Sequence, residues 1–184
     1  MRVTNSEIIT ATKQWLQEIV IGLDLCPFAK HALGSIEFSL SEAPDEQHLL
    51  ADLEQACLLL QNDSRVETLL LIHPNVLQDF DAYNQFLSYA DSLLDAMQLE
   101  GVIQVASFHP EYQFAETDFE SAENYTNRSP YPMLHLLREA SVELAIDSYP
   151  DVDAIPQRNI GTMQHLGSKN LKSKLLALQT VSKS

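Results

Sequence analysis

The residues best suited to chemistry lie in the second half of the sequence. His109 directly follows an apolar run that predicts a strand, and an imidazole is a common general acid or base near neutral pH. Arg128 stands before Ser129 and a proline-rich segment that predicts the start of a helix. Free N–H groups, the helix dipole and a guanidinium together favour a bound phosphate or carboxylate. The pattern therefore predicts a site for an anionic ligand with His109 as acid or base.

Further side chains are expected to join this site. His135 and Arg138 are three residues apart in a helical pattern over residues 133–146, so the two side chains share a helix face. His73 follows a second predicted strand, and it would lie on the order of 5–10 Å from His109 if the two strands were parallel neighbours. Arg158, near the start of a later predicted helix, offers a second anion contact. The substrate-binding residues that we expect are Arg128, Ser129, Tyr112, Asn127, Arg138, Arg158 and His73.

Cys26 precedes Pro27, which suits the first position of a short helix that Gly34 would end. A thiol at a helix N-terminus has a lowered pKa and can act as a nucleophile. The alternative is a small buried thiol packed between Leu25 and Phe28. Covalent catalysis by Cys26 requires His109 within hydrogen-bond reach. The expected catalytic residues are His109, Cys26 and His135.

Each of these residues also has a purely structural interpretation. A His-Pro pair after a strand is often a turn whose ring bonds to the backbone, and Arg128 can pair with one of many carboxylates. Arg138 is followed by Glu139, which favours a structural role. A zinc site is the weaker alternative because no HxxxH or CxxC motif supplies neighbouring ligands. The sequence names no cofactor.

The elements that must position these residues follow from hydrophobic periodicity. Apolar runs or alternation predict strands over residues 35–40, 66–72 and 102–108, and apolar stripes predict helices between and after them. These predicted helices span residues 4–21, start at Pro44 and Asp79, and span residues 133–146, 156–167 and 168–181. The alternation predicts a single α/β domain with a small, mainly parallel sheet of three or four strands flanked by helices. A helical segment ends the chain. No glycine-rich phosphate loop follows any predicted strand.

Composition limits the class of protein. The 184 residues carry 11 Lys and Arg against 26 Asp and Glu, a formal net charge of −15, which argues against nucleic acid as a partner. We expect no membrane partner, because no apolar run is long enough to span a bilayer and no secretory signal is visible. Two cysteines without CxxC spacing favour a reduced, cytoplasmic location.

The charge is unevenly distributed along the chain. Residues 1–153 hold 6 basic and 26 acidic residues, whereas residues 154–184 hold 5 basic residues and none that is acidic. We expect the basic C-terminal helices to lie on the acidic body or on a second subunit of a homo-oligomer.

Four blocks of sequence also carry a resemblance. Residues 22–29 (GLDLCPFA), 107–114 (SFHPEYQF), 126–139 (TNRSPYPMLHLLRE) and 155–160 (IPQRNI) resemble the signature blocks of a bacterial family that is a domain of unknown function. The likeness covers nearly the whole chain, with no departure from the pattern. It implies a bacterial, cytoplasmic, single-domain protein and no particular mechanism.

Two hypotheses for function follow. The first is a small cytoplasmic enzyme that acts on an anionic metabolite, with Arg128 and a helix N-terminus binding the anion and His109 as acid or base. The second is a non-catalytic ligand-binding or protein-interaction module. A pocket lined by His109 and Arg128 would favour the enzyme. Burial of both side chains in ion pairs or backbone bonds, together with an exposed apolar C-terminal surface, would favour the module.

Overall fold

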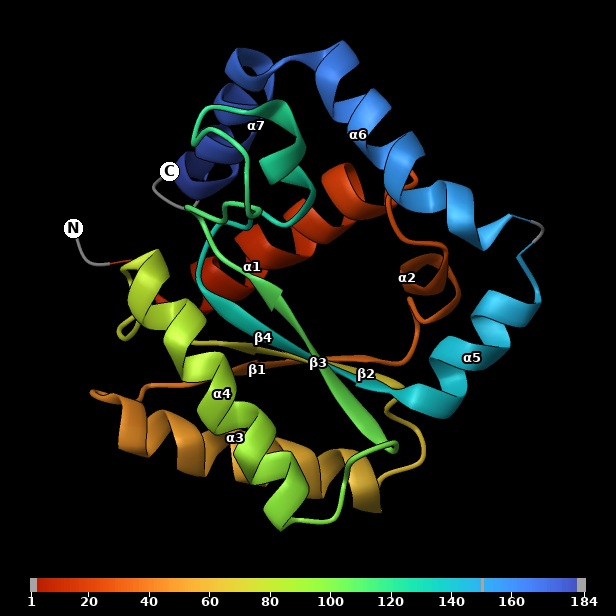
Figure 1. Ribbon diagram of the computed structural model, residues 1–184. Coiled ribbons are helices and arrows are strands. Elements are labelled where there is room, and N and C mark those ends of the chain that lie inside the picture. Colours follow the sequence, from red (N-terminus) through yellow and green to blue (C-terminus); the bar gives the residue numbers. More distant parts are fainter. Residues whose placement is uncertain (1–2, 150, 182–184) are drawn as a thin grey trace.

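A four-stranded β-sheet forms the centre of the molecule in the computed structural model, which describes residues 3–149 and 151–181 (Figure 1). Its strands are β1 (Ile36–Leu40), β2 (Thr68–Ile72), β3 (Ile103–Phe108) and β4 (Met133–Arg138), in the order β1-β2-β4-β3. The α/β class and the first three strands were predicted from the sequence, and both predictions are confirmed.

The expectation of a mainly parallel sheet is wrong. Only β1 and β2 pair in parallel, because β4 lies between β2 and β3 and is antiparallel to both. The helix expected over residues 133–146 is also wrong in its first half, since helix α5 (Glu139–Asp147) begins only after β4. The segment MLHLLR is apolar on both faces, as a central strand requires, and both of its edges are paired.

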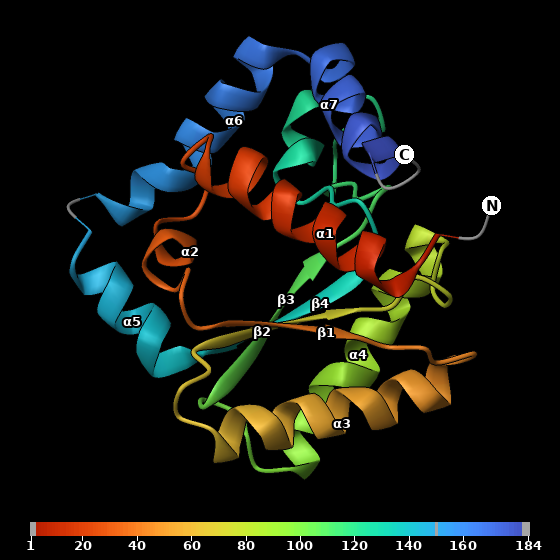
Figure 2. The same cartoon turned by 180° about the vertical axis from the view of Figure 1, so that it is seen from behind.

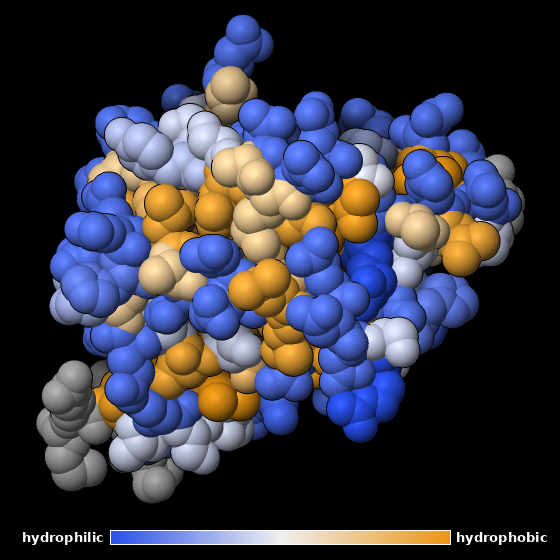
Figure 3. Space-filling model, turned by 90° about the horizontal axis from the view of Figure 1, so that it is seen from below, coloured by the Kyte–Doolittle hydropathy of each residue, from blue (hydrophilic) through white to orange (hydrophobic). Residues whose placement is uncertain are grey.

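Two long helices cover one face of the sheet (Figure 1). These are α3 (Glu46–Asn62) and α4 (Phe80–Ala96), each capped by an aspartate, Asp45 or Asp79, whose side chain accepts a backbone N–H of the first turn. Their apolar stripes pack on Leu69, Leu71, Leu134 and Leu136 in one buried cluster. On the outer surface of this layer, hydrophobic residues are interspersed with hydrophilic ones (Figure 3).

The remaining helices lie on the opposite face (Figures 1 and 2). Helix α1 (Asn5–Trp15) continues as a π-helix, η1 (Leu16–Ile21), which Gly22 ends as predicted. The short helix α2 (Pro27–His31) follows it. Helices α6 (Ile155–Leu166) and α7 (Ser168–Val181) form the outer part of this side, and short 3-10 helices η2 (Ala122–Thr126) and η3 (Val152–Ala154) lie in the connections.

The C-terminal helices dock on the body of the same chain. Met163 of α6 and Leu171 and Leu178 of α7 are buried in the cluster that contains Trp15 and Ile19. The Lys172 ammonium lies 3.5 Å from the Glu120 carboxylate, so one basic residue of this segment does meet the acidic body. Within the described part of the chain, no helix has the length and apolar character needed to cross a membrane.

Candidate functional site

His109 follows β3 and is fully buried. Its Nδ1 accepts the N–H of Glu111 at 3.0 Å, and its Nε2 donates to the Leu77 carbonyl oxygen at 3.1 Å. The ring packs on Phe80 and Tyr83 of α4. Burial lowers the pKa of His109, so the imidazole is neutral. These contacts match the structural interpretation of a His-Pro turn with a backbone-bonded ring.

His73 lies at the same edge of the sheet, after β2. Its Nδ1 donates to the Val76 carbonyl oxygen at 3.1 Å, and its ring stacks on Tyr83 at a centroid distance of 5.8 Å. Burial lowers the pKa of His73 to about 4. The expectation that both histidines share one edge of the sheet is met, and both rings contact Tyr83. Their strands are not neighbours, because β4 separates them.

Arg128 is 4% exposed, and its guanidinium binds backbone carbonyls. Nε donates to Tyr112 O at 3.0 Å and Nη2 to Phe119 O at 2.6 Å, while the rings of Phe119 and Tyr125 lie 4.5 and 4.6 Å from Cζ. No helix starts after Arg128, so the expected helix N-terminus for an anion is wrong. Arg128 instead fixes the loop that links β3 to β4.

The neighbours of Arg128 are likewise engaged with the backbone. Asn127 donates from Nδ2 to the Ser107 carbonyl oxygen at 3.0 Å, and Ser129 donates from Oγ to the Tyr131 carbonyl oxygen at 2.7 Å. Tyr112 contributes its carbonyl oxygen to Arg128, and its ring packs on Phe80 and Phe114. The Arg128 region is thus a loop-stabilising cluster.

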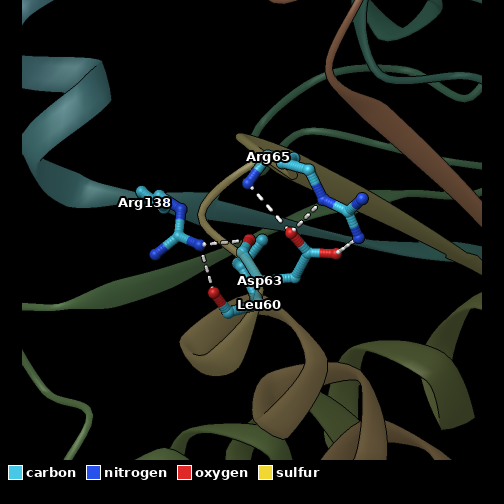
Figure 4. A network of polar contacts seen from close by, with 4 residues as sticks. All are labelled: Leu60, Asp63, Arg65 and Arg138. Carbon is cyan, nitrogen blue, oxygen red and sulfur yellow. Dashed lines mark hydrogen bonds and ion pairs between the residues drawn. The ribbon is translucent and has the colours of Figure 1, made fainter.

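His135 and Arg138 lie on β4, and they do not share a face because a spacing of three in a strand places them on opposite sides. The Thr68 hydroxyl donates to the Leu136 carbonyl oxygen, so its own oxygen accepts from His135. Nε2 of His135 is therefore the donor in the 2.6 Å contact with Thr68 Oγ1. Arg138 donates to the carbonyl oxygens of Leu60 and Asp63 at the end of α3 (Figure 4). It also donates to the Val66 carbonyl oxygen, just before β2. Arg138 therefore has a structural role, because it joins the end of β4 to the connection between α3 and β2.

Cys26 is the N-cap residue of α2, and Pro27 occupies the first turn as predicted. The expected lowering of its pKa is wrong, because burial raises the pKa of the thiol more than the nearby N–H groups of Ala29 and Phe28 lower it. The thiol packs with Phe28 on the α2 side of the sheet, whereas the His109 ring packs with Phe80 on the α4 side. A Cys26–His109 catalytic pair is therefore excluded.

Beside Cys26 lies an apolar cavity of about 290 Å³, which we call the Cys26 cavity. Its wall comes from α2, α5, the link that follows α5 and the start of α6. Apart from the thiol and the Tyr149 phenol, the lining side chains are hydrocarbon: they include Pro27, Phe28, Val142, Ala145, Ile146 and Ile155.

A second cavity, of about 380 Å³, lies on the other side of the first turn of α6, and we call it the Asn159 cavity. Ile155 and Pro156 contribute to both cavities. The rest of its lining comes from η2, the preceding loop and α6: Phe114, Thr117, Glu123, Thr126, Asn127, Asn159 and Ile160.

Arg158 is the remaining predicted anion-binding residue. It donates to the Asp24 carbonyl oxygen at 2.8 Å and to the Tyr149 hydroxyl, and it lies 3.7 Å from the Asp24 carboxylate. Its guanidinium thus links α6 to the segment before Cys26. Within residues 3–149 and 151–181, no three His, Cys, Asp or Glu side chains are grouped so as to hold a metal ion.

The predicted site residues do not converge on one cavity. Of the expected residues, only Cys26 lines the first cavity and only Asn127 lines the second. Sequence reasoning missed Glu123, Asn159 and the apolar side of α5. Asn159 carried one signal, because it belongs to the block at residues 155–160.

A protein family model matches residues 7–173, and its description is "Protein of unknown function (DUF1415)". The chain belongs to this family. Neither a curated protein nor a solved structure matches it. Both cavities lie entirely within the matched residues.

Proposed function

We propose that the protein is a non-catalytic interaction module that holds a basic, amphipathic segment of a partner protein against α5 and the Cys26 cavity. The observation that carries the proposal is helix α5, which has no fully buried residue and whose Val142, Ala145 and Ile146 line an apolar cavity.

Two apolar side chains of α5 are exposed to solvent, and they lie on different sides of the helix. Leu144 is 72% exposed and Ile146 is 45% exposed, and Ile146 also lines the Cys26 cavity. Val142 and Ala145, which line the cavity as well, are only partly covered. Exposed apolar surface at the edge of a pocket, which Ile146 provides here, is typical of protein interaction sites. An apolar side chain of a partner would complete the burial of α5.

The charge around this surface defines the partner. Residues 139–153 contain Glu139, Glu143, Asp147, Asp151 and Asp153 and no Lys or Arg. An acidic rim around an apolar centre favours a partner with the opposite charge and speeds their encounter. We therefore infer that the bound segment has an apolar face flanked by Lys or Arg.

This proposal is favoured over the enzyme hypothesis by the contacts of the expected catalytic groups. Both ring nitrogens of His109 and the guanidinium of Arg128 bind backbone atoms in the interior. Backbone bonding of both was one of the two outcomes expected for a module. The other, an exposed apolar C-terminal surface, is not met by Leu171 and Leu178, which are buried. Action on an anionic metabolite stays a prediction, and so does assembly into a homo-oligomer.

The test is binding of a synthetic amphipathic helix of Leu and Lys, measured by fluorescence anisotropy. Ile146→Asp, at the edge of the Cys26 cavity, should weaken binding at least tenfold, which corresponds to about 1.4 kcal/mol. Leu59→Asp is the matched control, because Leu59 is an exposed leucine of α3 on the opposite face of the sheet and the charge change is the same. Equal loss in the two variants would refute the proposed surface.

A second pair of variants tests the cavity. Ala145→Phe places a ring in the Cys26 cavity and should weaken binding of the peptide by a similar factor. Ala140→Phe adds the same ring to an exposed position of α5 and should leave binding unchanged. If Ala145→Phe bound the peptide as tightly as the wild type, the cavity would have no part in recognition.

A further inference from the structure

We infer that the Asn159 cavity binds a protonated amine attached to a small apolar body. The site is distinct from the α5 surface, and the inference does not depend on the function proposed above.

The first observation is a buried acceptor without a donor. Asn159 is only 7% exposed and lines the cavity. Its amide orientation is fixed, because only Nδ2 can donate to the Leu25 carbonyl oxygen, which lies 2.8 Å away. The other terminal atom of the amide is therefore the oxygen Oδ1, and it has no hydrogen-bond partner among the described residues. A buried unpaired acceptor is unfavourable, so a donor supplied by a ligand would stabilise this arrangement.

The second observation is a free carboxylate in the same wall. Glu123 is half-buried, and within residues 3–149 and 151–181 it forms no hydrogen bond or ion pair. No Lys, Arg or His lines the cavity. A carboxylate and an amide oxygen together offer acceptors only, which selects a ligand with several N–H donors and a positive charge.

The N-terminus of α6 favours an anion rather than a cation, so its partial charge must be compared with the charge of Glu123. Its N-cap residue, Ala154, has no capping side chain, and a helix N-terminus carries roughly half a positive charge that favours anions. The full negative charge of Glu123 exceeds this partial charge. Two guanidinium groups are adjacent in sequence to lining residues, and both are bound elsewhere. Arg158 binds Asp24 and Tyr149, and Arg128 binds the carbonyl oxygens of residues 112 and 119. The balance at the cavity therefore favours a cation.

The remaining wall defines the body of the ligand. Phe114, Ile155, Pro156 and Ile160 are apolar, and the volume of about 380 Å³ is near the lower end of the range for small-molecule sites. A single aromatic ring or a branched alkyl group attached to the ammonium group fits these requirements.

The test is titration of the full chain with three probes that share a body and differ in charge: 2-phenylethylamine, 2-phenylethanol and phenylacetate. Protein NMR follows the side-chain amide of Asn159 and the backbone amides of the cavity wall. We expect the amine to shift these signals with the lowest dissociation constant. Glu123→Gln should raise that constant about tenfold, whereas Glu120→Gln, three residues earlier and paired with Lys172, should leave it unchanged.

Three outcomes would overturn the inference. Equal affinity for the alcohol and the amine would show that the site does not require a positive charge. Tighter binding of phenylacetate would show that the site prefers an anion. If 2-phenylethylamine, isobutylamine and methylamine all fail to shift the Asn159 amide, the cavity is not an amine site. Ile146→Asp should bind the amine like the wild type, because Ile146 does not line the Asn159 cavity, so failure of the α5 surface and failure of this site are separable.

Discussion

Single residues with catalytic potential are used here to hold the interior together. His73, His109 and His135 are all buried, each has at least one ring nitrogen bonded within the fold, and burial lowers the pKa of all three. Arg128 and Arg138 bind five backbone carbonyl groups between them. An arginine bonded in this way orders the segments around it without offering its charge to a ligand.

The buried histidines make stability depend on pH. Burial lowers the pKa of His135 from 6.5 to about 4, so between these values the unfolded chain binds more protons than the folded chain. The stabilisation is present above pH 6.5 and is lost as the pH falls towards 4. His135→Leu should flatten the decline measured by urea unfolding between pH 6.5 and 5 by up to about 1.4 kcal/mol per pH unit. Parallel curves for the two proteins would contradict this.

Elements are joined at their ends by side-chain to backbone bonds, and the end of α3 is the clearest case. Arg138, the last residue of β4, donates to three carbonyl oxygens around the α3–β2 connection, while Arg65 binds only the Asp63 carboxylate (Figure 4). The end of a helix leaves carbonyl groups without partners, and Arg138 supplies donors for them.

We therefore expect Arg138→Ala to destabilise the fold by about 2 kcal/mol, because it leaves carbonyl groups of a partly buried connection unpaired. Arg65→Ala is the matched control. The Arg65 side chain is 88% exposed, so the change in stability should be much smaller. Chemical unfolding of both variants measures the difference, and equal effects would show that the Arg138 contacts are not needed.

Gly22 fixes the end of η1 by close approach. A Cβ at this position would lie 2.5 Å from the backbone oxygen of Glu18, so Gly22→Ala must shift the backbone and should cost about 1–3 kcal/mol. At Gly161, in the interior of α6, a Cβ meets nothing within 4 Å. There the same change should stabilise the protein by about 0.5–1 kcal/mol. Thermal melts of the two variants should therefore move in opposite directions.

The sequence is informative about elements whose pattern is local. Strands β1, β2 and β3 follow from alternation or from a short apolar run bounded by turn residues. Strand β4 does not, because four apolar residues among six, followed by a helical pattern, fit a buried helix equally well. Only pairing with β2 and β3 decides its conformation. The site was harder to predict, since the partners of Arg128 are backbone oxygens of residues 112 and 119, which no spacing rule reveals.

At the scale of the whole molecule, the C-terminal helices complete the core. Leu171 and Leu178 of α7 are buried against the α1 side of the molecule. Deleting residues 168–184 should remove about 3–6 kcal/mol from these two leucines alone. That loss is comparable to the total stability of many domains, so the truncated chain should melt far lower.

Circular dichroism melting of the truncated chain checks this prediction. Lys172→Ala, which removes only the exposed ion pair with Glu120, is the control and should melt near the wild type. Unchanged melting of the truncated chain would show that α7 is an appendage. Because the deletion acts on folding itself, the oligomeric state is better measured by light scattering on the full-length chain.

The central position of β4 has a consequence for biosynthesis. The ribosome delivers β1, β2 and β3 before residues 133–138, yet β2 and β3 never pair with each other and are joined only through β4. Until the last strand emerges, two apolar strands present unpaired edges to the crowded cell, which invites aggregation. Sheet closure is thus a late, long-range event in the synthesis of this chain.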